Sequence, residues 1–578
     1  MPRQAAPRHQ KMADAMRAAK AAAAGGSVFR AKDLTRAQLE LLKTGHWLLE
    51  MHMGWHALIH AQDSREGNTV PYYSNYWEFV RKYLNDRLGN DYALSAHASL
   101  ALHTDCYTIP NQLSVHTTRS TQGIVNLPNG LSIAVIMDRN LSTNGIVQSN
   151  DGLRLLSLEQ ALAAMPAASY RLPSPELKAA IAAVRNIAEL TRIMLASPSG
   201  GPAAGRLTEA LGAAGRGADA DSIKETFAAA GVEVGAGAGI AEGTYQALSG
   251  RPKSGIAARL TNMWLTMSQQ ISSGFVPTAD AATFKNSDVT KLKNRIREIY
   301  AYDAYNSLSI EGYSVTPELI ERVASGDFNE SLNSEDRKET DALAARGYFE
   351  AYNKVIAGVA QIHGGMDLTS VLERACLDWR VALFSPMVTA GLLPPDSLAG
   401  YRNKPVYIRN SMHVPPPHEK LMDAMESLFE CIRTEQDPWA RAVLAHYAFV
   451  NIHPFPDGNG RIGRFLMNAL LVTAGFDWTV VRVSQRPAYF AALEQASTKS
   501  DIIPLSTFLA GEMTAGGQGE SVDPSNIDYG KSKKLTPLSA ASTSADPHKP
   551  QGPKSDCVPP GCSDGPTKKR TCAVHRER

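Results

Sequence analysis

Residues 453–464 bring together the side chains that chemistry on a nucleotide phosphate requires. The segment reads His-Pro-Phe-Pro-Asp-Gly-Asn-Gly-Arg-Ile-Gly-Arg. His453 is suited to accept a proton from an attacking hydroxyl near neutral pH. Asp457 offers the hard oxygen ligand that Mg²⁺ prefers beside nucleotide phosphates. Arg461 and Arg464 are close enough along an expected helix to clamp two phosphate groups.

The turn Gly458-Asn459-Gly460 lies directly before a segment, 461–471, whose apolar side chains have helical spacing. Glycines at a helix start let backbone N–H groups approach an anion, and the helix dipole favours negative charge there. Each feature alone has a simpler explanation, as a loop, a surface turn or a solvated helix face. Their concentration in one segment favours a phosphate-binding site.

The segment resembles the motif of the Fic family, His-x-Phe-x-Asp/Glu-Gly-Asn-Gly-Arg-x-x-Arg, at every defined position. The resemblance implies a helical core that transfers AMP from ATP to a hydroxyl of a target protein. It assigns His453 as the base, Asp457 as the Mg²⁺ ligand, and Gly458, Asn459 and Gly460 as the phosphate-holding turn. It also implies that Phe455 anchors the loop in the core, and that Arg461 and Arg464 hold the β- and γ-phosphate region.

Two further parts of the chain resemble this family. Residues 400–417 alternate in polarity and end in prolines, which is typical of the family's β-hairpin flap, an edge that pairs with an extended target segment. Tyr489 is a candidate for the adenine pocket, although an aromatic residue at helical spacing more often belongs to a core. An ordinary solvent-exposed hairpin is the alternative for 400–417.

Residues 307–312, Ser-Leu-Ser-Ile-Glu-Gly, resemble the inhibitory pattern Ser/Thr-x-x-x-Glu-Gly/Asn of the same family. On a helix, Ser307 and Glu311 are one turn apart and share a face. The resemblance implies that Glu311 pairs with Arg464 and blocks productive seating of the γ-phosphate. In some relatives the same glutamate orients water to remove AMP, so a removal activity is a further expectation.

Composition restricts the other function classes. The chain has 578 residues, 44% of them hydrophobic, and a formal net charge of +2, so we expect several globular domains and no overall polycation. Six cysteines are scattered without a disulfide pattern, which favours a reducing compartment. No run of about 18 apolar residues occurs. We therefore expect a cytoplasmic protein without a membrane span.

The predicted organisation is multidomain. An N-terminal winged helix and an α+β region precede an all-α Fic core with a β-hairpin flap and a disordered tail. The expected divisions are a flexible basic arm (1–26), a winged-helix-like domain (27–66), an AbiEi-like α+β and helical region (67–250), a Fic domain (251–515) with its inhibitory helix near 300–313, and the tail (516–578).

The N-terminal half resembles AbiEi-type antitoxin and regulator proteins over about residues 29–155, on a helix-turn-helix-hairpin outline, the segment 94–102 and the strand-like piece around 113. Cationic residues Arg30, Lys32, Arg36 and Lys43 are placed to meet DNA phosphates, but Asp33 and Glu40 dilute them. A module that contacts only proteins is an equal alternative.

Two functions therefore stand. The first is a regulated AMP-transferase with ATP as substrate, Mg²⁺ as cofactor and an unidentified target protein as partner. The second is a DNA-binding regulator that uses the Fic core as a nucleotide sensor. Because a pure sensor has no need of a general base, His453 favours the enzyme. A homodimer is a further expectation, since dimer exchange is one way to relieve an inhibitory helix.

Overall fold

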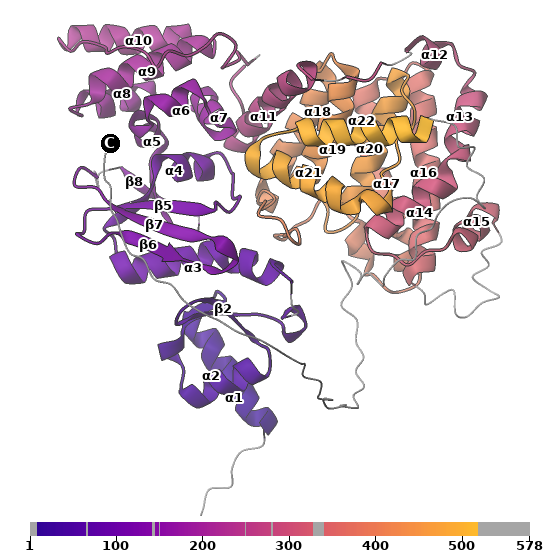
Figure 1. Ribbon diagram of the computed structural model, residues 1–578, viewed down its shortest axis with the longest axis horizontal. Coiled ribbons are helices and arrows are strands. Elements are labelled where there is room, and N and C mark those ends of the chain that lie inside the picture. The colour runs from indigo at the N-terminus through magenta and orange to yellow at the C-terminus, as the bar shows by residue number, and fades with distance from the viewer. Residues whose placement is uncertain are drawn as a thin grey trace, which may run out of the picture. The chain divides into compact units, whose positions relative to one another are not determined.

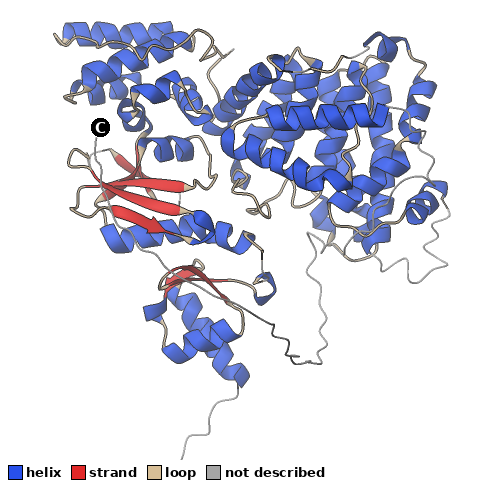
Figure 2. Ribbon diagram, viewed as in Figure 1, coloured by secondary structure: helices blue, strands red, loops and turns tan. Residues whose placement is uncertain are grey.

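The computed structural model describes residues 8–64, 67–141, 145–149, 151–248, 250–274, 276–278, 281–326 and 340–517. Helices dominate, and the strands are confined to the N-terminal third of the chain (Figures 1 and 2). Within these residues, no helix is long and apolar enough to cross a membrane.

The N-terminal segment folds as two helices beside a three-stranded antiparallel sheet of order β1-β3-β2. Gly54, at φ 78°, makes the turn between β2 and β3. Ala15, Ala19 and Ala23 recur every four residues and pack with Phe29, Leu34 and Leu42. The predicted flexible arm is therefore wrong for residues 8–26, because this alanine stripe buries one face of the first helix. The elements are α1 (Arg8–Ala22), β1 (Val28–Arg30), α2 (Arg36–Thr44), β2 (Leu48–His52) and β3 (Trp55–Leu58).

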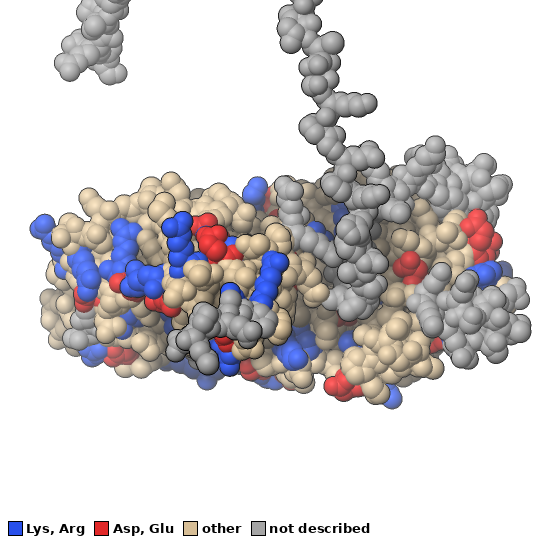
Figure 3. All heavy atoms as spheres, turned by 90° about the horizontal axis from the view of Figure 1, so that it is seen from below, with Lys and Arg blue, Asp and Glu red and all other residues tan. Residues whose placement is uncertain are grey.

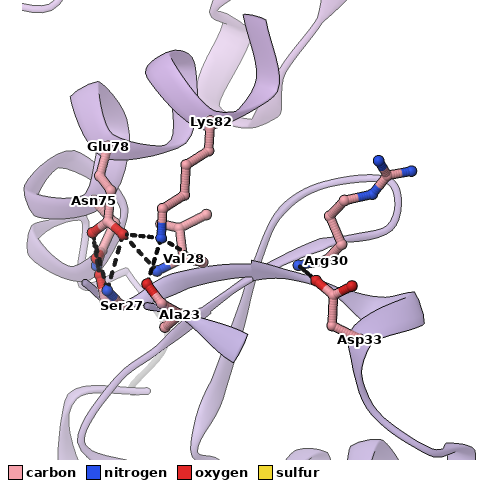
Figure 4. Close-up of polar contacts among 8 residues, drawn as sticks. All are labelled: Ala23, Ser27, Val28, Arg30, Asp33, Asn75, Glu78 and Lys82. Atoms are coloured by element: carbon pink, nitrogen blue, oxygen red, sulfur yellow. Dashed lines mark hydrogen bonds and ion pairs between the residues drawn. The ribbon is translucent and has the colours of Figure 1, made fainter. Parts of the chain in front are cut away.

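A polar network fixes this segment to helix α3 (Val70–Leu88) (Figure 4). The carboxylate of Glu78 accepts hydrogen bonds from the backbone N–H groups of Ser27 and Val28 and from the Ser27 hydroxyl. Lys82 donates to the carbonyls of Ala23 and Val28 at 2.6 and 2.7 Å. Since the Lys82 ammonium also pairs with Glu78 at 2.8 Å, two charges and several backbone groups are satisfied together.

A four-stranded sheet of order β4-β5-β7-β6 follows, with β5 and β7 parallel and the other pairs antiparallel. Figure 2 shows this sheet between helices α3 and α4. The segment 94–102, taken as one patterned stretch in the sequence, ends β4 and then forms α4, whose start is capped by Ser95. The elements are β4 (Tyr92–Leu94), α4 (Ala96–His103), β5 (Gln112–Thr117), β6 (Gly123–Asn126), β7 (Ser132–Met137), β8 (Ile146–Gln148) and β9 (Arg154–Leu156).

Short helices then build a separate small core around Leu162, Leu177, Leu190, Leu207 and Phe227. These helices are α5 (Leu158–Ala164), α6 (Ala167–Arg171), α7 (Pro175–Ala183), α8 (Ile187–Leu195), α9 (Gly200–Ala213) and α10 (Gly217–Ala229).

The C-terminal part is helical and has one continuous core that extends from Ile256 to Ala510. Helix α20 lies inside it and packs against α16, α17 and α19 (Figure 1). The helices are α11 (Gly255–Ser272), α12 (Ala281–Asn286), α13 (Val289–Glu298), α14 (Tyr300–Ile310), α15 (Pro317–Ser325), α16 (Thr340–His363), α17 (Leu368–Thr389), α18 (Leu421–Thr434), α19 (Pro438–Ile452), α20 (Asn459–Ala474), α21 (Arg486–Lys499) and α22 (Ile503–Gly517).

The predicted β-hairpin flap is wrong in form, because residues 399–417 contain no strand. Prolines at 405 and 415–417 remove backbone donors that a ladder needs. The remaining donors bond elsewhere: Asn410 N–H donates to Thr69 Oγ1 and Met412 N–H to Glu494 Oε1, both at 2.9 Å. We call residues 402–416 the flap segment from here on.

The flap segment also contacts the N-terminal part of the chain. Ile109 N–H donates to the Met412 carbonyl at 3.0 Å, and Met412 and Val414 pack against the core of the four-stranded sheet. The winged-helix assignment of residues 27–66 and the AbiEi-like assignment of 67–250 stay predictions. Nearly all of the predicted tail, 516–578, lies outside the described residues.

Candidate active site

His453 ends helix α19 in a strained backbone conformation. Its φ and ψ are 53° and 57°, a left-handed geometry that residues other than glycine rarely adopt, and a proline follows it. Such strain costs about 1–3 kcal/mol and persists only where the surroundings impose it. Two hydrogen bonds to the main chain of His453 hold this conformation. His453 N–H donates to Phe449 O, and His453 O accepts from Arg402 Nε at 2.8 Å.

The imidazole of His453 has a defined tautomer. Its Nδ1 lies 3.1 Å from the carbonyl oxygen of Val450, which only accepts hydrogen bonds, so Nδ1 carries the proton and Nε2 keeps a lone pair. Burial lowers the pKa of His453, while the carboxylates of Asp457 and Glu311 oppose that shift. The ring is therefore neutral at pH 7 and able to take a proton at Nε2.

The turn before α20 has a glycine-dependent backbone geometry. Gly458 has φ 87°, and a Cβ there would lie 2.9 Å from the ring of Phe384. The Asn459 side chain forms two hydrogen bonds with the backbone of Phe455. Its Oδ1 accepts from Phe455 N–H at 2.9 Å, and its Nδ2 donates to Phe455 O at 2.8 Å. The Asn459 amide therefore shapes the loop, and the Gly458 N–H donates to Asp457 Oδ1 at 2.6 Å.

Arg461 is 1% exposed, and its Nε and Nη1 have no hydrogen-bond partner among the described residues. Its guanidinium lies between two rings, 5.2 Å from the centroid of Tyr313 and 5.1 Å from that of Phe384. The Oδ2 atom of Asp457 lies 3.5 Å from Nη2 of Arg461. Buried N–H groups without acceptors are costly, so a ligand that supplies oxygen atoms would be stabilised here.

Arg464 is held by the segment that the sequence identified as inhibitory. Its Nε donates to Ser307 Oγ at 3.0 Å, and its Nη2 donates to Ser307 O at 3.1 Å and to Glu311 Oε1 at 2.8 Å. Helix α14 carries Ser307, and Glu311 is its C-terminal cap. The structure thus joins Ser307, Glu311 and Arg464 in one cluster, in which Ser307 and Arg464 are buried and Glu311 is partly exposed.

Glu311 also lies against the start of α20. A Cβ added to Gly460 would be 2.3 Å from Glu311 Oε1, so a carboxylate lies where the helix favours an anion. Burial opposes ionisation of Glu311, but the guanidiniums of Arg464 and Arg461 outweigh it and lower its pKa. Glu311 is therefore charged at pH 7 and placed where a phosphate would bind.

Two other predicted residues lie in the core. Phe455 is fully buried, and its ring contacts those of Tyr401 and Phe449. Tyr489 is 1% exposed, stacks on His446 and has its hydroxyl 2.8 Å from His446 Nε2. Helix α21 places this ring in the core, and the adenine-pocket assignment of Tyr489 stays a prediction.

Asp457 is the carboxylate within the loop that could face a metal. No group of three or more His, Cys, Asp or Glu side chains in the described ranges is arranged around a metal ion. Mg²⁺ bound to nucleotides needs only one or two protein carboxylates, since phosphates and water complete its shell. The side chain of Asp457 is 39% exposed, so it is accessible to a metal ion that phosphates and water also bind.

Sequence reasoning did not identify Phe384, Tyr313 or Arg402. Tyr313 directly follows Gly312, the last residue of the inhibitory pattern, so its position in the sequence could have identified it. Phe384 lies far from residues 453–464 in the chain, and Arg402 lies within the predicted flap, 400–417, but was not singled out there.

Part of the chain is similar to known proteins. Residues 384–471 match the model of the Fic/DOC family. The chain is 30% identical over 223 residues to a protein adenylyltransferase Fic of Nematostella vectensis, covering 38% of this chain and 48% of that protein. It is 28% identical over 280 residues to the protein of the same name from Drosophila grimshawi, covering 46% and 53%. The chain thus spans about half the length of these curated relatives.

Among solved structures, the chain resembles residues 134–508 of Fic-1 from C. elegans. The identity is 18%, the match covers 62% of this chain and 89% of that one, and the TM-score is 0.33.

Proposed function

Because this chain contains a Fic/DOC domain at residues 384–471, we propose that it transfers AMP from ATP to a hydroxyl side chain of a target protein. Relatives named protein adenylyltransferase support the reaction class. The Gly458-Asn459-Gly460 turn matches the Fic motif at each position, which supports AMP transfer.

The proposed reaction assigns each residue one step. The target hydroxyl oxygen attacks the α-phosphorus of ATP, and its proton passes to Nε2 of His453. The bond between the α-phosphorus and the bridging oxygen breaks, and pyrophosphate leaves. The start of α20 and the buried guanidinium of Arg461 stabilise the negative charge of the phosphates. Mg²⁺, held by Asp457 and the phosphates, would supply further charge neutralisation.

We further propose that Glu311 restrains this activity. The contact of Glu311 Oε1 with Arg464 Nη2 at 2.8 Å is the observation that supports the restraint most strongly. While that contact persists, Arg464 is unable to bind the γ-phosphate, and the carboxylate repels it from the start of α20. Removal of AMP from the target by water that Glu311 orients is a second activity of the same site.

The position of the transferred label tests the reaction. The Glu311→Gly variant is incubated with a lysate and either α-³²P-ATP or γ-³²P-ATP. Protein label from the α-phosphate alone is the expected result. Label from the γ-phosphate would indicate a kinase, and acid-resistant label that persists in His453→Ala would contradict the assigned base.

DNA binding by the N-terminal segment is a second candidate function. Residues 8–64 contain eight Lys or Arg against five Asp or Glu. Six of the cations are exposed and form no ion pair within the described structure, whereas Arg17 pairs with Asp14 and Arg30 with Asp86. The six are Arg8, Lys11, Lys20, Lys32, Arg36 and Lys43.

The charges are not purely cationic. Figure 3 shows that on one face Lys and Arg side chains gather toward the left of the view, interleaved with Asp and Glu. Binding of a labelled duplex by the full chain at two salt concentrations tests this candidate. Binding that weakens with salt, and is lost when Lys32, Arg36 and Lys43 are changed together to Gln, is expected. No binding at low salt would contradict it.

A further inference from the structure

Arg402 is a buried cation without a buried anion. Its side chain is 4% exposed, and it forms no ion pair with any described residue. Burial lowers its pKa to about 10, so it remains charged at neutral pH. Enclosing an unpaired charge in this way is costly and is tolerated where hydrogen bonds satisfy its N–H groups.

Those N–H groups bond to three main-chain carbonyls. Nε donates to His453 O at 2.8 Å, Nη1 to Lys404 O at 3.1 Å and Nη2 to Pro416 O at 2.5 Å. The backbone N–H of Arg402 adds a bond to Pro454 O at 2.9 Å. One residue therefore joins both ends of the flap segment to the first two residues of the catalytic loop.

Arg402 bonds to His453, whose backbone conformation is unfavourable by itself. His453 has a left-handed backbone conformation before a proline, and its carbonyl would rotate away if nothing bound it. Because Nδ1 of the same residue must stay on Val450 O, a rotated backbone would also displace Nε2.

We propose that Arg402 is a positioning residue that fixes Nε2 of His453 relative to the flap segment, and so relative to the target hydroxyl. This inference rests on the proposed transferase function. Arg402 touches neither ATP nor the hydroxyl in this account; it acts through the carbonyl of His453. Binding of the phosphates, which involves the start of α20, should not depend on it.

The kinetic test uses Glu311→Gly as the parent, with single-turnover transfer measured against ATP concentration. Arg402→Ala should lower the maximal rate about 10²-fold, the scale of a 1 Å misplacement, and leave the half-saturating ATP concentration within about threefold. Arg402→Lys should recover part of the rate, because an ammonium still reaches one carbonyl.

Arg259 provides a matched control. It is 5% exposed, and its guanidinium donates to two main-chain carbonyls, those of Thr104 and Asp105, neither of which belongs to the catalytic loop. Arg259→Ala should lower the melting temperature with no more than about a threefold change in rate. An Arg402→Ala rate equal to the parent's, or reduced only in proportion to the folded fraction, would overturn the proposal.

A second readout does not need catalysis. Removing the Arg402 guanidinium removes a cation near His453 and loosens its enclosure, so the pKa of His453 should rise toward its ordinary value of 6.5. A ¹⁵N NMR titration of the histidine rings measures this pKa, and the His453→Ala variant identifies the signal of His453. An unchanged titration in Arg402→Ala would refute the positioning role. If Glu311→Gly transfers no label at all, the transferase assignment fails, and this titration still tests the contact between Arg402 and His453.

Discussion

Arg464 Nη2 donates a hydrogen bond to Glu311 Oε1 at 2.8 Å across 153 residues of sequence. Arg464 is buried, and the Glu311 side chain is 23% exposed. The pair therefore has the geometry of a strong charge-assisted bond whose acceptor is still reachable from solvent. A phosphate that enters must displace this carboxylate or bind beside it.

Ser307 should contribute a smaller part of the restraint. Ser307→Ala removes the hydroxyl that accepts from Arg464 Nε, but leaves the bonds from Arg464 Nη2 to Ser307 O and Glu311. We expect AMP transfer to increase about 3- to 10-fold, the equivalent of roughly 1 kcal/mol. Label transfer by wild type, Ser307→Ala and Glu311→Gly under the same conditions measures this. A rate at or above that of Glu311→Gly would show that Ser307 is the main restraint.

The transfer rate should persist into mildly acidic solution. His453 acts as a base only when neutral, and its pKa is lowered below 6.5. In Glu311→Gly the loss of a nearby carboxylate lowers that pKa further. Single-turnover rates between about pH 5 and pH 8 should therefore fall only below pH 6.5. A midpoint at or above 6.5 would contradict the assignment of His453 as the titrating base.

The Glu311–Arg464 pair should stabilise the fold in a pH-dependent way. The pKa of Glu311 is lowered from 4.5, so its stabilisation is complete above pH 4.5 and is lost as the pH falls through the lower, folded value. Glu311→Gln should lower the free energy of unfolding by about 1–3 kcal/mol at pH 7.

The melting temperatures of wild type and Glu311→Gln should converge below pH 4.5. Glu298, an exposed glutamate that ends the preceding helix α13, gives the control, and Glu298→Gln should have no such effect. A difference of the same size at pH 7 and at the lowest pH would rule out the ion pair as its source.

Glu494 should control how the flap segment presents a target. Its Oε2 accepts from Ser411 Oγ at 2.5 Å and its Oε1 from Met412 N–H at 2.9 Å. Glu494→Ala should speed hydrogen exchange of the Met412 amide and raise the KM for a protein target about 3- to 10-fold, with the ATP KM unchanged. Glu430→Ala, which breaks an exposed pair with Arg433, is the control. A change in the ATP KM alone would place Glu494 with the nucleotide instead.

The sequence specified the loop 453–464 because its chemistry is local: base, carboxylate, glycine turn and arginines occupy consecutive positions. Ser307 and Glu311 were identifiable for a similar reason, since one helical turn separates them. Arg402 left no comparable signal, because its partners are main-chain carbonyls, and the carbonyl of His453 is 51 residues away. Main-chain acceptors have no residue type that a sequence pattern could detect.

The errors in the fold have equally specific causes. Alternating polarity in the flap segment favoured a hairpin, but Thr69 and Glu494 supply hydrogen-bond partners in place of a second strand. Alanine and basic residues near the N-terminus suggested a flexible arm, yet Ala15, Ala19 and Ala23 form a helical stripe that packs on Leu42.

Label transfer from α-³²P-ATP tests the central claim most directly, with wild type, Glu311→Gly, Glu311→Gly combined with His453→Ala, and Glu298→Gly as the control. The account predicts strong label only in Glu311→Gly, at least about 10-fold above wild type, and its loss when His453 is also replaced. Equal label in wild type and Glu311→Gly, or label that survives the loss of His453, would contradict it.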